Sequence, residues 1–145
     1  MGDLSKEINS KFANNKVKAL LNIIYTANLI STRQNEFFKP FGISPQQYNI
    51  LRILKGAKGP LKVQTIKERM LERSPNATRL MDKLCAKGYI ERCASKEDRR
   101  VVKITITKAG LDFLETIPIH SHSEFLKNLT EEEAEQLSNL LDKMR

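Results

Sequence analysis

The chain has 145 residues, of which 40% are hydrophobic and 29% charged, so it is long enough for one ordinary globular domain with a single core. No apolar run approaches the roughly 18 residues that cross a bilayer, and no basic stretch followed by an apolar one opens the chain. We therefore expect a cytoplasmic protein without membrane span or secretory signal, in which Cys85 and Cys93 are thiols and not a disulfide.

The net charge of +8 is unevenly distributed. Residues 51–110 hold 16 Lys and Arg against 6 Asp and Glu, a local charge of +10, whereas the rest of the chain holds 9 against 11, or −2. A basic charge alone fits any soluble basic protein. A basic block on a slightly acidic frame is better explained as a surface that attracts phosphate.

The N-terminal part of the chain carries a helical pattern. Apolar residues recur at helical spacing from about Leu4 to Ile30, and neither Gly nor Pro interrupts the pattern after Gly2. The pattern predicts one long helix or two joined helices, too long for a small domain to cover. Pro40 and Gly42 should end this helical run.

A further helix is predicted after that break. Ser44 and Pro45 form a cap and a first turn, Gln47 completes a capping box, and the helix should end before Gly56. Four aromatic residues surround its start. They either fill the core, which is the commoner role of such side chains, or line a cavity for a small-molecule effector: Phe37, Phe38, Phe41 and Tyr48.

Residues 62–107 form the most informative segment. They read as a helix, a sharp turn, a second helix that opens at Ser74, and two strands, 89–94 and 101–107, on either side of a charged loop. A helix that fits a DNA groove, followed by a basic hairpin that reaches the neighbouring groove, is the layout of a winged helix-turn-helix. Duplex DNA is therefore the leading candidate partner.

The second helix of this segment is predicted to have two different faces. Ser74 should cap it, Pro75 should occupy its first turn, and Gly88 should supply the positive φ at its C-terminal end. The face that should lie in the core carries Leu80, Met81, Leu84 and Cys85.

The opposite face carries the chemistry of a recognition helix. Asn can pair with adenine and Arg with guanine, while hydroxyls and backbone amides hold phosphate. Any one of these residues would fit a solvated helix face equally well. Together, beside the turn and the hairpin, they favour DNA: Asn76, Thr78, Arg79, Lys83 and Lys87.

The hairpin should form the wing. Val102, Ile104 and Ile106 alternate with polar residues, as in a half-buried ribbon. The loop cannot bury its basic residues together, and Asp98 can pair with a neighbouring Arg. Such a pair would shape the loop and leave another Arg for a narrow, electronegative minor groove. The basic residues are Lys96, Arg99 and Arg100.

The C-terminal part is again mostly helical. Residues from Thr107 to about Leu126 should form a helix that Pro118 kinks or breaks. A capping box at residues 130–133 predicts a final helix with an apolar stripe. Striped terminal helices pack either on each other or on a second copy of the chain, and a two-fold dimer would suit palindromic DNA.

Several of these motifs resemble those of the MarR family of bacterial transcription regulators. The resemblance rests on Ser74–Leu84, Gly88–Arg92, the Asp98-Arg99-Arg100 triplet and Ile104–Gly110, and it extends over nearly the whole chain. The turn at residues 71–73 reads Leu-Glu-Arg, where the family often has Gly followed by an apolar residue.

The resemblance implies a mainly α fold with a small antiparallel β-wing (α+β). It implies a homodimer with interlocked terminal helices that binds pseudo-palindromic operators, most often as a repressor released by a small molecule or an oxidant. Ser74, Pro75, Asn76, Thr78 and Arg79 would then touch the major groove. In the wing, Asp98 and Arg100 would brace the loop, and Arg99 or Lys96 would lie nearer the minor groove.

These expectations divide the chain by role. A single domain would span residues 1–145, with a DNA-binding lobe at 48–110 and dimerisation helices at 1–36 and 111–145. No Gly-rich phosphate loop, strong metal-ligand spacing or nucleophile–base pair indicates an enzyme, and no cofactor is expected. The alternative is a winged helix that binds another protein instead of DNA, which a neutral or acidic recognition face would favour.

Two weaker hypotheses concern sensing. Cys85 and Cys93 lie near positive charge and would be oxidation switches if they were exposed with a lowered pKa, although Cys85 should be buried. His120 and His122 are spaced so that a helix would point them apart, so surface or structural histidines are favoured over a metal site.

Overall fold

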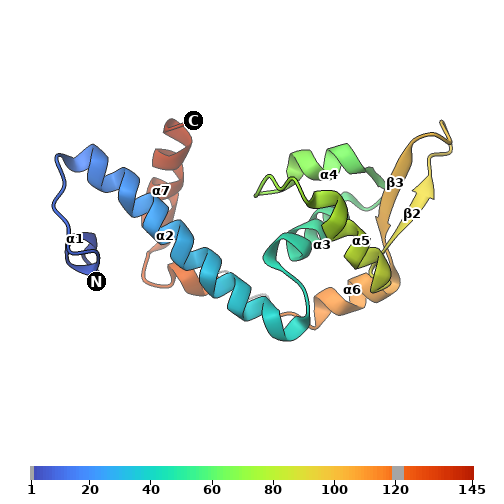
Figure 1. Ribbon diagram of the computed structural model, residues 1–145, viewed down its shortest axis with the longest axis horizontal. Coiled ribbons are helices and arrows are strands. Elements are labelled where there is room, and N and C mark those ends of the chain that lie inside the picture. Colours follow the sequence, from blue (N-terminus) through green and yellow to red (C-terminus); the bar gives the residue numbers. More distant parts are fainter. Residues whose placement is uncertain (1, 119–122) are drawn as a thin grey trace.

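The computed structural model describes residues 2–118 and 123–145. Figure 1 shows an extended stem, built on one long helix, that joins a lobe of short helices and a small sheet. The stem consists of α1 (Leu4–Glu7), α2 (Asn15–Phe38), η3 (Ser123–Leu126) and α7 (Glu131–Lys143). The lobe consists of α3 (Pro45–Ala57), β1 (Leu61–Lys62), α4 (Val63–Arg69), α5 (Ala77–Ala86), β2 (Ile90–Ala94), β3 (Val102–Ile106) and α6 (Lys108–Glu115). The predicted mainly α fold with a small antiparallel sheet is confirmed.

The N-terminal helical pattern resolves into two helices. Asp3 caps α1 by accepting a hydrogen bond from the amide of Ser5, and Asn14 caps α2 by accepting one from the amide of Val17 at 3.0 Å. The helix α2 continues to Phe38, beyond the predicted Ile30. A short 3-10 helix, η1 (Lys39–Phe41), follows it and ends at Gly42.

The predicted break at Gly42 and the predicted start of the next helix are both present. Gly42 has φ 72°, in the left-handed region that suits glycine. Ser44 and Gln47 form the predicted capping box at the start of α3. The predicted end before Gly56 was wrong, because the helix runs to Ala57 and stops at Lys58, which has φ 54°. A glycine near a helix end costs only about 1 kcal/mol, which the packing of α3 offsets.

Most apolar side chains of the stem are not buried within one chain. Phe38 is the one buried residue of α2 among those described, and α7 buries none of its residues. The capping box of Thr130 and Glu133 at the start of α7 is confirmed. The predicted apolar stripe is present but open to solvent. The large exposed residues of the stem are Ile8, Val17, Leu20, Leu21, Ile24, Tyr25, Leu29, Leu126, Leu129, Leu137, Leu140 and Met144.

The lobe is built around α3. Ile50, Leu51 and Leu54 of this helix are at most 1% exposed and lie in one core cluster with residues of α4, α5, β2 and β3. Phe38 joins the same cluster, with its ring centroid 4.7 Å from that of Tyr48. The end of α2 is therefore anchored in the lobe core.

The sheet has three antiparallel strands in the order β1-β3-β2. The two wing strands lie within one residue of their predicted bounds, but β1 was not predicted, because two residues are too few to show an alternating pattern. Leu61 pairs with Ile104, which is fully buried. Val102, predicted on the same buried face, is 45% exposed because it lies next to the loop at the tip of the wing.

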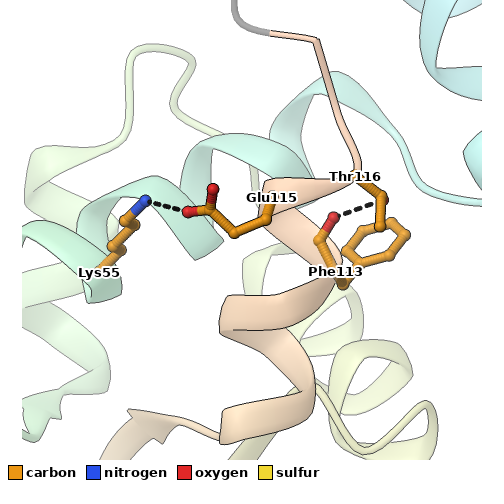
Figure 2. Close-up of polar contacts among 4 residues, drawn as sticks. All are labelled: Lys55, Phe113, Glu115 and Thr116. Atoms are coloured by element: carbon orange, nitrogen blue, oxygen red, sulfur yellow. Dashed lines mark hydrogen bonds and ion pairs between the residues drawn. The ribbon is translucent and has the colours of Figure 1, made fainter.

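The helix predicted from Thr107 to about Leu126 is much shorter. Thr107 caps α6, which ends at Glu115, and Pro118 follows three residues later. Figure 2 shows two contacts at this end: the Thr116 hydroxyl donates to the Phe113 carbonyl at 2.6 Å, and Lys55 of α3 pairs with Glu115 at 3.1 Å. The break near Pro118 is confirmed, and the continuation of one helix to Leu126 was wrong.

No helix among the described residues is both long and apolar enough to span a membrane.

Candidate nucleic-acid interface

The segment before α5 differs from the prediction in detail. The N-cap of α5 is Asn76, not Ser74. The Ser74 hydroxyl accepts a hydrogen bond from the amide of Asn76 at 3.2 Å, and the Ser74 carbonyl accepts one from Ala77 at 3.3 Å. Ser74 and Pro75 therefore lie in a turn that precedes the helix. A serine hydroxyl can bond to the backbone amide two residues on, which moves the helix start along the chain.

The two faces of α5 agree with the prediction. Met81 and Leu84 are buried, and Leu80 and Cys85 are half-buried against the core cluster. Gly88 has φ 77°, as the predicted C-terminal cap requires. The predicted recognition residues are exposed except Ser74, which is half-buried: Pro75, Asn76, Thr78, Arg79 and Lys83.

Asp82 of α5 and Lys87, the C-cap residue of that helix, are held by contacts inside the chain. Asp82 pairs with Arg92 of β2, which ties α5 to the wing. The ammonium of Lys87 donates to the carbonyl of Gly42 at 2.5 Å. Lys87 was predicted to stand with the DNA-facing residues, but it points instead toward the end of the stem. Arg79 and Lys83 have no bonded partner within the described parts of the chain, so they are available to an external anion.

The wing loop is shaped by backbone contacts. The predicted ion pair between Asp98 and an Arg does not occur among the described residues. The Asp98 carboxylate accepts instead from the amide of Arg100 at 3.0 Å, and the Asp98 carbonyl accepts from the amide of Val101 at the same distance. An aspartate commonly forms such a turn, because its carboxylate reaches the amide two residues on. Lys96, Arg99 and Arg100 remain exposed on the loop.

The turn between α4 and α5 is held by α3. The amide of Leu71 donates to the Asn49 side chain at 3.0 Å, and the Gln46 side chain donates to Glu72 at 2.7 Å. These contacts fix the turn, which reads Leu-Glu-Arg at residues 71–73 and contains no glycine. The Leu71 side chain is 92% exposed.

A cavity of about 350 Å³ lies beside that turn, where the end of α2 meets α3. Its wall is partly apolar, with Phe38, Tyr48 and Met70, and partly polar, with Gln34, Asn49 and Arg52 among others. Of the four predicted aromatics, Phe37 and Phe41 are not part of this wall. They pack against the core cluster, with their ring centroids 5.6 Å apart. Because the wall holds Glu72 as well as Arg52, it suits a small molecule with an apolar body and a polar or charged group.

The remaining candidate groups are the two cysteines and the two histidines. Cys85 and Cys93 are both free thiols and both half-buried, so the predicted burial of Cys85 is only partial. The Cys93 thiol donates to the carbonyl of Lys103 at 3.6 Å. No cluster of His, Cys, Asp and Glu suited to a metal occurs in residues 2–118 and 123–145. His120 and His122 lie outside the described residues.

Comparisons with known proteins identify relatives of this chain in sequence and in structure. A model of the MarR family matches residues 41–101. The HTH-type transcriptional regulator PapX of Escherichia coli is 32% identical over 119 residues, which cover 79% of this chain and 73% of PapX. The crystal structure of a MarR transcription factor from Planctomyces limnophilus is 31% identical, covers 91% of this chain and 98% of its own, and has a TM-score of 0.69.

A third relative was solved with DNA. The crystal structure of a mutant MarR from Escherichia coli in complex with operator DNA is 26% identical to this chain, with a TM-score of 0.75. The match covers 99% of both chains, so it includes the stem as well as the lobe.

Proposed function

This chain belongs to the MarR family, whose members are transcription regulators and not enzymes, and on that premise we propose that it represses its target genes by binding operator DNA as a homodimer. One observation carries the DNA-binding part of the proposal. The exposed basic residues of α5 and of the wing loop have no bonded partner among the described side chains and stand on a winged-helix lobe: Arg79, Lys83, Lys96, Arg99 and Arg100.

In the proposed complex, α5 enters the major groove. The turn at Ser74 and Pro75, together with Asn76, Thr78 and Arg79, would meet base edges and nearby phosphates, and Lys83 would meet the backbone. The exposed wing loop would reach the adjacent minor groove through Arg99 or Lys96, with Asp98 and Arg100 shaping it.

The stem supports the dimer part of the proposal. Its exposed apolar side chains include Leu20, Ile24, Leu140 and Met144, each at least half exposed, and such a surface is unusual on a monomer. We expect sedimentation equilibrium to give about twice the 16.6 kDa mass of one chain. Leu20→Glu places charges in the interface and should return the protein to monomers. A wild-type chain that stays monomeric at micromolar concentration would contradict this part.

The cavity beside the α4–α5 turn supports release by a small molecule. A ligand that fills it would contact Phe38 from the stem side and Met70 from the turn before α5. Occupancy could then favour a lobe orientation that does not fit DNA. Titrating the selected DNA complex with small aromatic acids tests this part, and a complex unaffected by ligands that bind the protein would argue against it.

The proposal predicts steep salt dependence. Binding to a short random duplex, followed by fluorescence anisotropy, should weaken by roughly a thousandfold between 50 and 200 mM salt if about six phosphates are contacted. Arg99→Ala should weaken binding to all sequences evenly and lower the slope by about 1 for each subunit. Lys143→Ala removes the same charge from the stem and should leave the slope unchanged. Absence of duplex binding at low salt would favour the winged-helix protein-interaction alternative.

A further inference from the structure

Another hollow, of about 470 Å³, lies where the end of α2, η1 and the start of α3 meet α5. Its described lining residues are all different from those of the cavity beside the α4–α5 turn. Three lysines line it: Lys39 of η1, Lys83 of α5 and Lys87 at the C-terminal cap of α5. Among the described lining residues, Glu36 alone is acidic, so the wall carries an excess of two positive charges.

The lysine charges on this wall are not cancelled inside the chain. The ammonium of Lys87 donates to the carbonyl of Gly42 at 2.5 Å, and this acceptor is neutral. The bond therefore fixes the ammonium beside the hollow but leaves its charge, and two of its three donors, for another acceptor. Lys39 and Lys83 are exposed, and neither forms an ion pair within residues 2–118 and 123–145. All three lysines can therefore bind an external anion.

The groups that line the hollow suit a phosphate ester. Lys83 and Lys87 are four residues apart, so they lie on one side of the helix end, and Lys39 lines the wall on the η1 side. The Ser44 hydroxyl accepts from the amide of Gln47 at 3.2 Å and keeps its own O–H for an anion. Lysine binds phosphate as a point charge, and a dianion would balance the excess of two. The volume of the hollow lies within the usual range of small-molecule sites.

From this arrangement we propose that the hollow binds a small phosphate monoester, and that the bound ester weakens DNA binding by occupying Lys83. The second part rests on the proposed function, in which Lys83 meets the DNA backbone. An ammonium held by the ester is no longer available to a DNA phosphate, so the two ligands compete for one charge. By thermodynamic linkage, DNA must weaken the binding of the ester by the same factor.

The first experiment titrates the full chain, without DNA, with glycerol phosphate at constant ionic strength and follows the heat of binding. The wild type should bind glycerol phosphate at millimolar concentration and should not bind glycerol, which lacks the charge. Lys39→Gln should bind about tenfold more weakly, because it loses one charge-assisted hydrogen bond. Glu36→Gln removes the negative charge from the wall and should bind about threefold more tightly. Lys143→Gln removes a charge from the stem and should match the wild type.

The second experiment measures the competition with DNA. Saturating glycerol phosphate should weaken binding of the wild type to the selected duplex by about tenfold, relative to sodium chloride at the same ionic strength. Lys39 belongs to η1, outside the elements proposed to touch DNA, so Lys39→Gln should keep the duplex affinity and the salt slope of the wild type. The same variant should need about tenfold more glycerol phosphate for an equal effect on the duplex.

The two experiments separate this inference from the proposed function. If the wild type binds no duplex, yet binds glycerol phosphate with the expected changes in Lys39→Gln and Glu36→Gln, the DNA-binding proposal fails and the site is supported. If the ester binds in the hollow without weakening the duplex complex, the competition is rejected.

Three outcomes would overturn the site itself. The first is no binding of glycerol phosphate by the wild type at millimolar concentration. The second is equal binding by the wild type, Lys39→Gln and Glu36→Gln, which would place the ester elsewhere on the protein. The third is a lower salt slope in Lys39→Gln, which would make the hollow a contact for the DNA backbone and not a site for a free ester.

Discussion

Replacing Arg79 with Ala should weaken binding to the selected operator by about 1–3 kcal/mol and relax the base preference at one position of each half-site. Arg79 is exposed in the first turn of α5 and has no bonded partner within the described chain, so its guanidinium can reach a base edge. Alanine is the best helix former, so the helix itself should persist. Binding titrations and a new selection from the random pool measure the two effects separately.

Arg79→Lys is the matched control for this prediction. Lysine keeps the positive charge but lacks the planar fork that binds the two acceptors of guanine. The variant should therefore keep the salt slope of the wild type and lose most of the base preference. If Arg79→Ala left both affinity and selected sequence unchanged, α5 would not be the reading helix, and the proposed placement of its N-terminal residues would be wrong.

Local patterns explain why so much of the lobe could be predicted. The spacing of Leu80, Met81 and Leu84 fixes which side of α5 faces the core, and therefore which side faces outward. Capping residues act on amides three positions away, so Ser44 and Thr130 were assigned correctly from sequence. Ser74 was assigned wrongly because the same hydroxyl chemistry also stabilises a turn before the helix.

Contacts between distant residues could not be predicted in this way. Lys87 and Gly42 are 45 positions apart, and Asp82 and Arg92 lie on different elements. No periodicity relates such pairs, so Lys87 looked like one more basic residue of the outward face. The folded chain divides that face into residues that are held internally and residues that are free. The division changes the expected number of phosphate contacts, because Lys87 is already bonded to the Gly42 carbonyl.

The stem illustrates a different limit. Its apolar stripes were recognised, but periodicity gives the same pattern whether the covering surface belongs to the same chain or to a second copy. In the described residues, α7 buries none of its side chains and α2 buries only Phe38. That exposure favours the second copy, and it is the physical reason for proposing the dimer.

The close approach of α6 to the sheet yields the largest expected effect on stability. A Cβ atom at Gly110 would lie 2.2 Å from the carbonyl oxygen of Tyr89 and 2.7 Å from a carbon of Ile106. The Tyr89 carbonyl cannot move away freely, because it accepts a hydrogen bond from the amide of Thr107 at 3.0 Å. Gly110→Ala should therefore lower the free energy of unfolding by about 3 kcal/mol, at the upper end of the usual cost of overpacking.

Gly56→Ala provides the control. Gly56 also lies in a helix, but a Cβ atom there would meet no atom within 4 Å. Since alanine restricts the unfolded chain and favours the helix, this variant should gain about 0.5–1 kcal/mol. Urea unfolding at one fixed protein concentration compares the variants, because dimer dissociation would make stability concentration-dependent. Equal stability of Gly110→Ala and the wild type would mean that α6 can shift away from Tyr89, and that its position against the wing is not fixed by this contact.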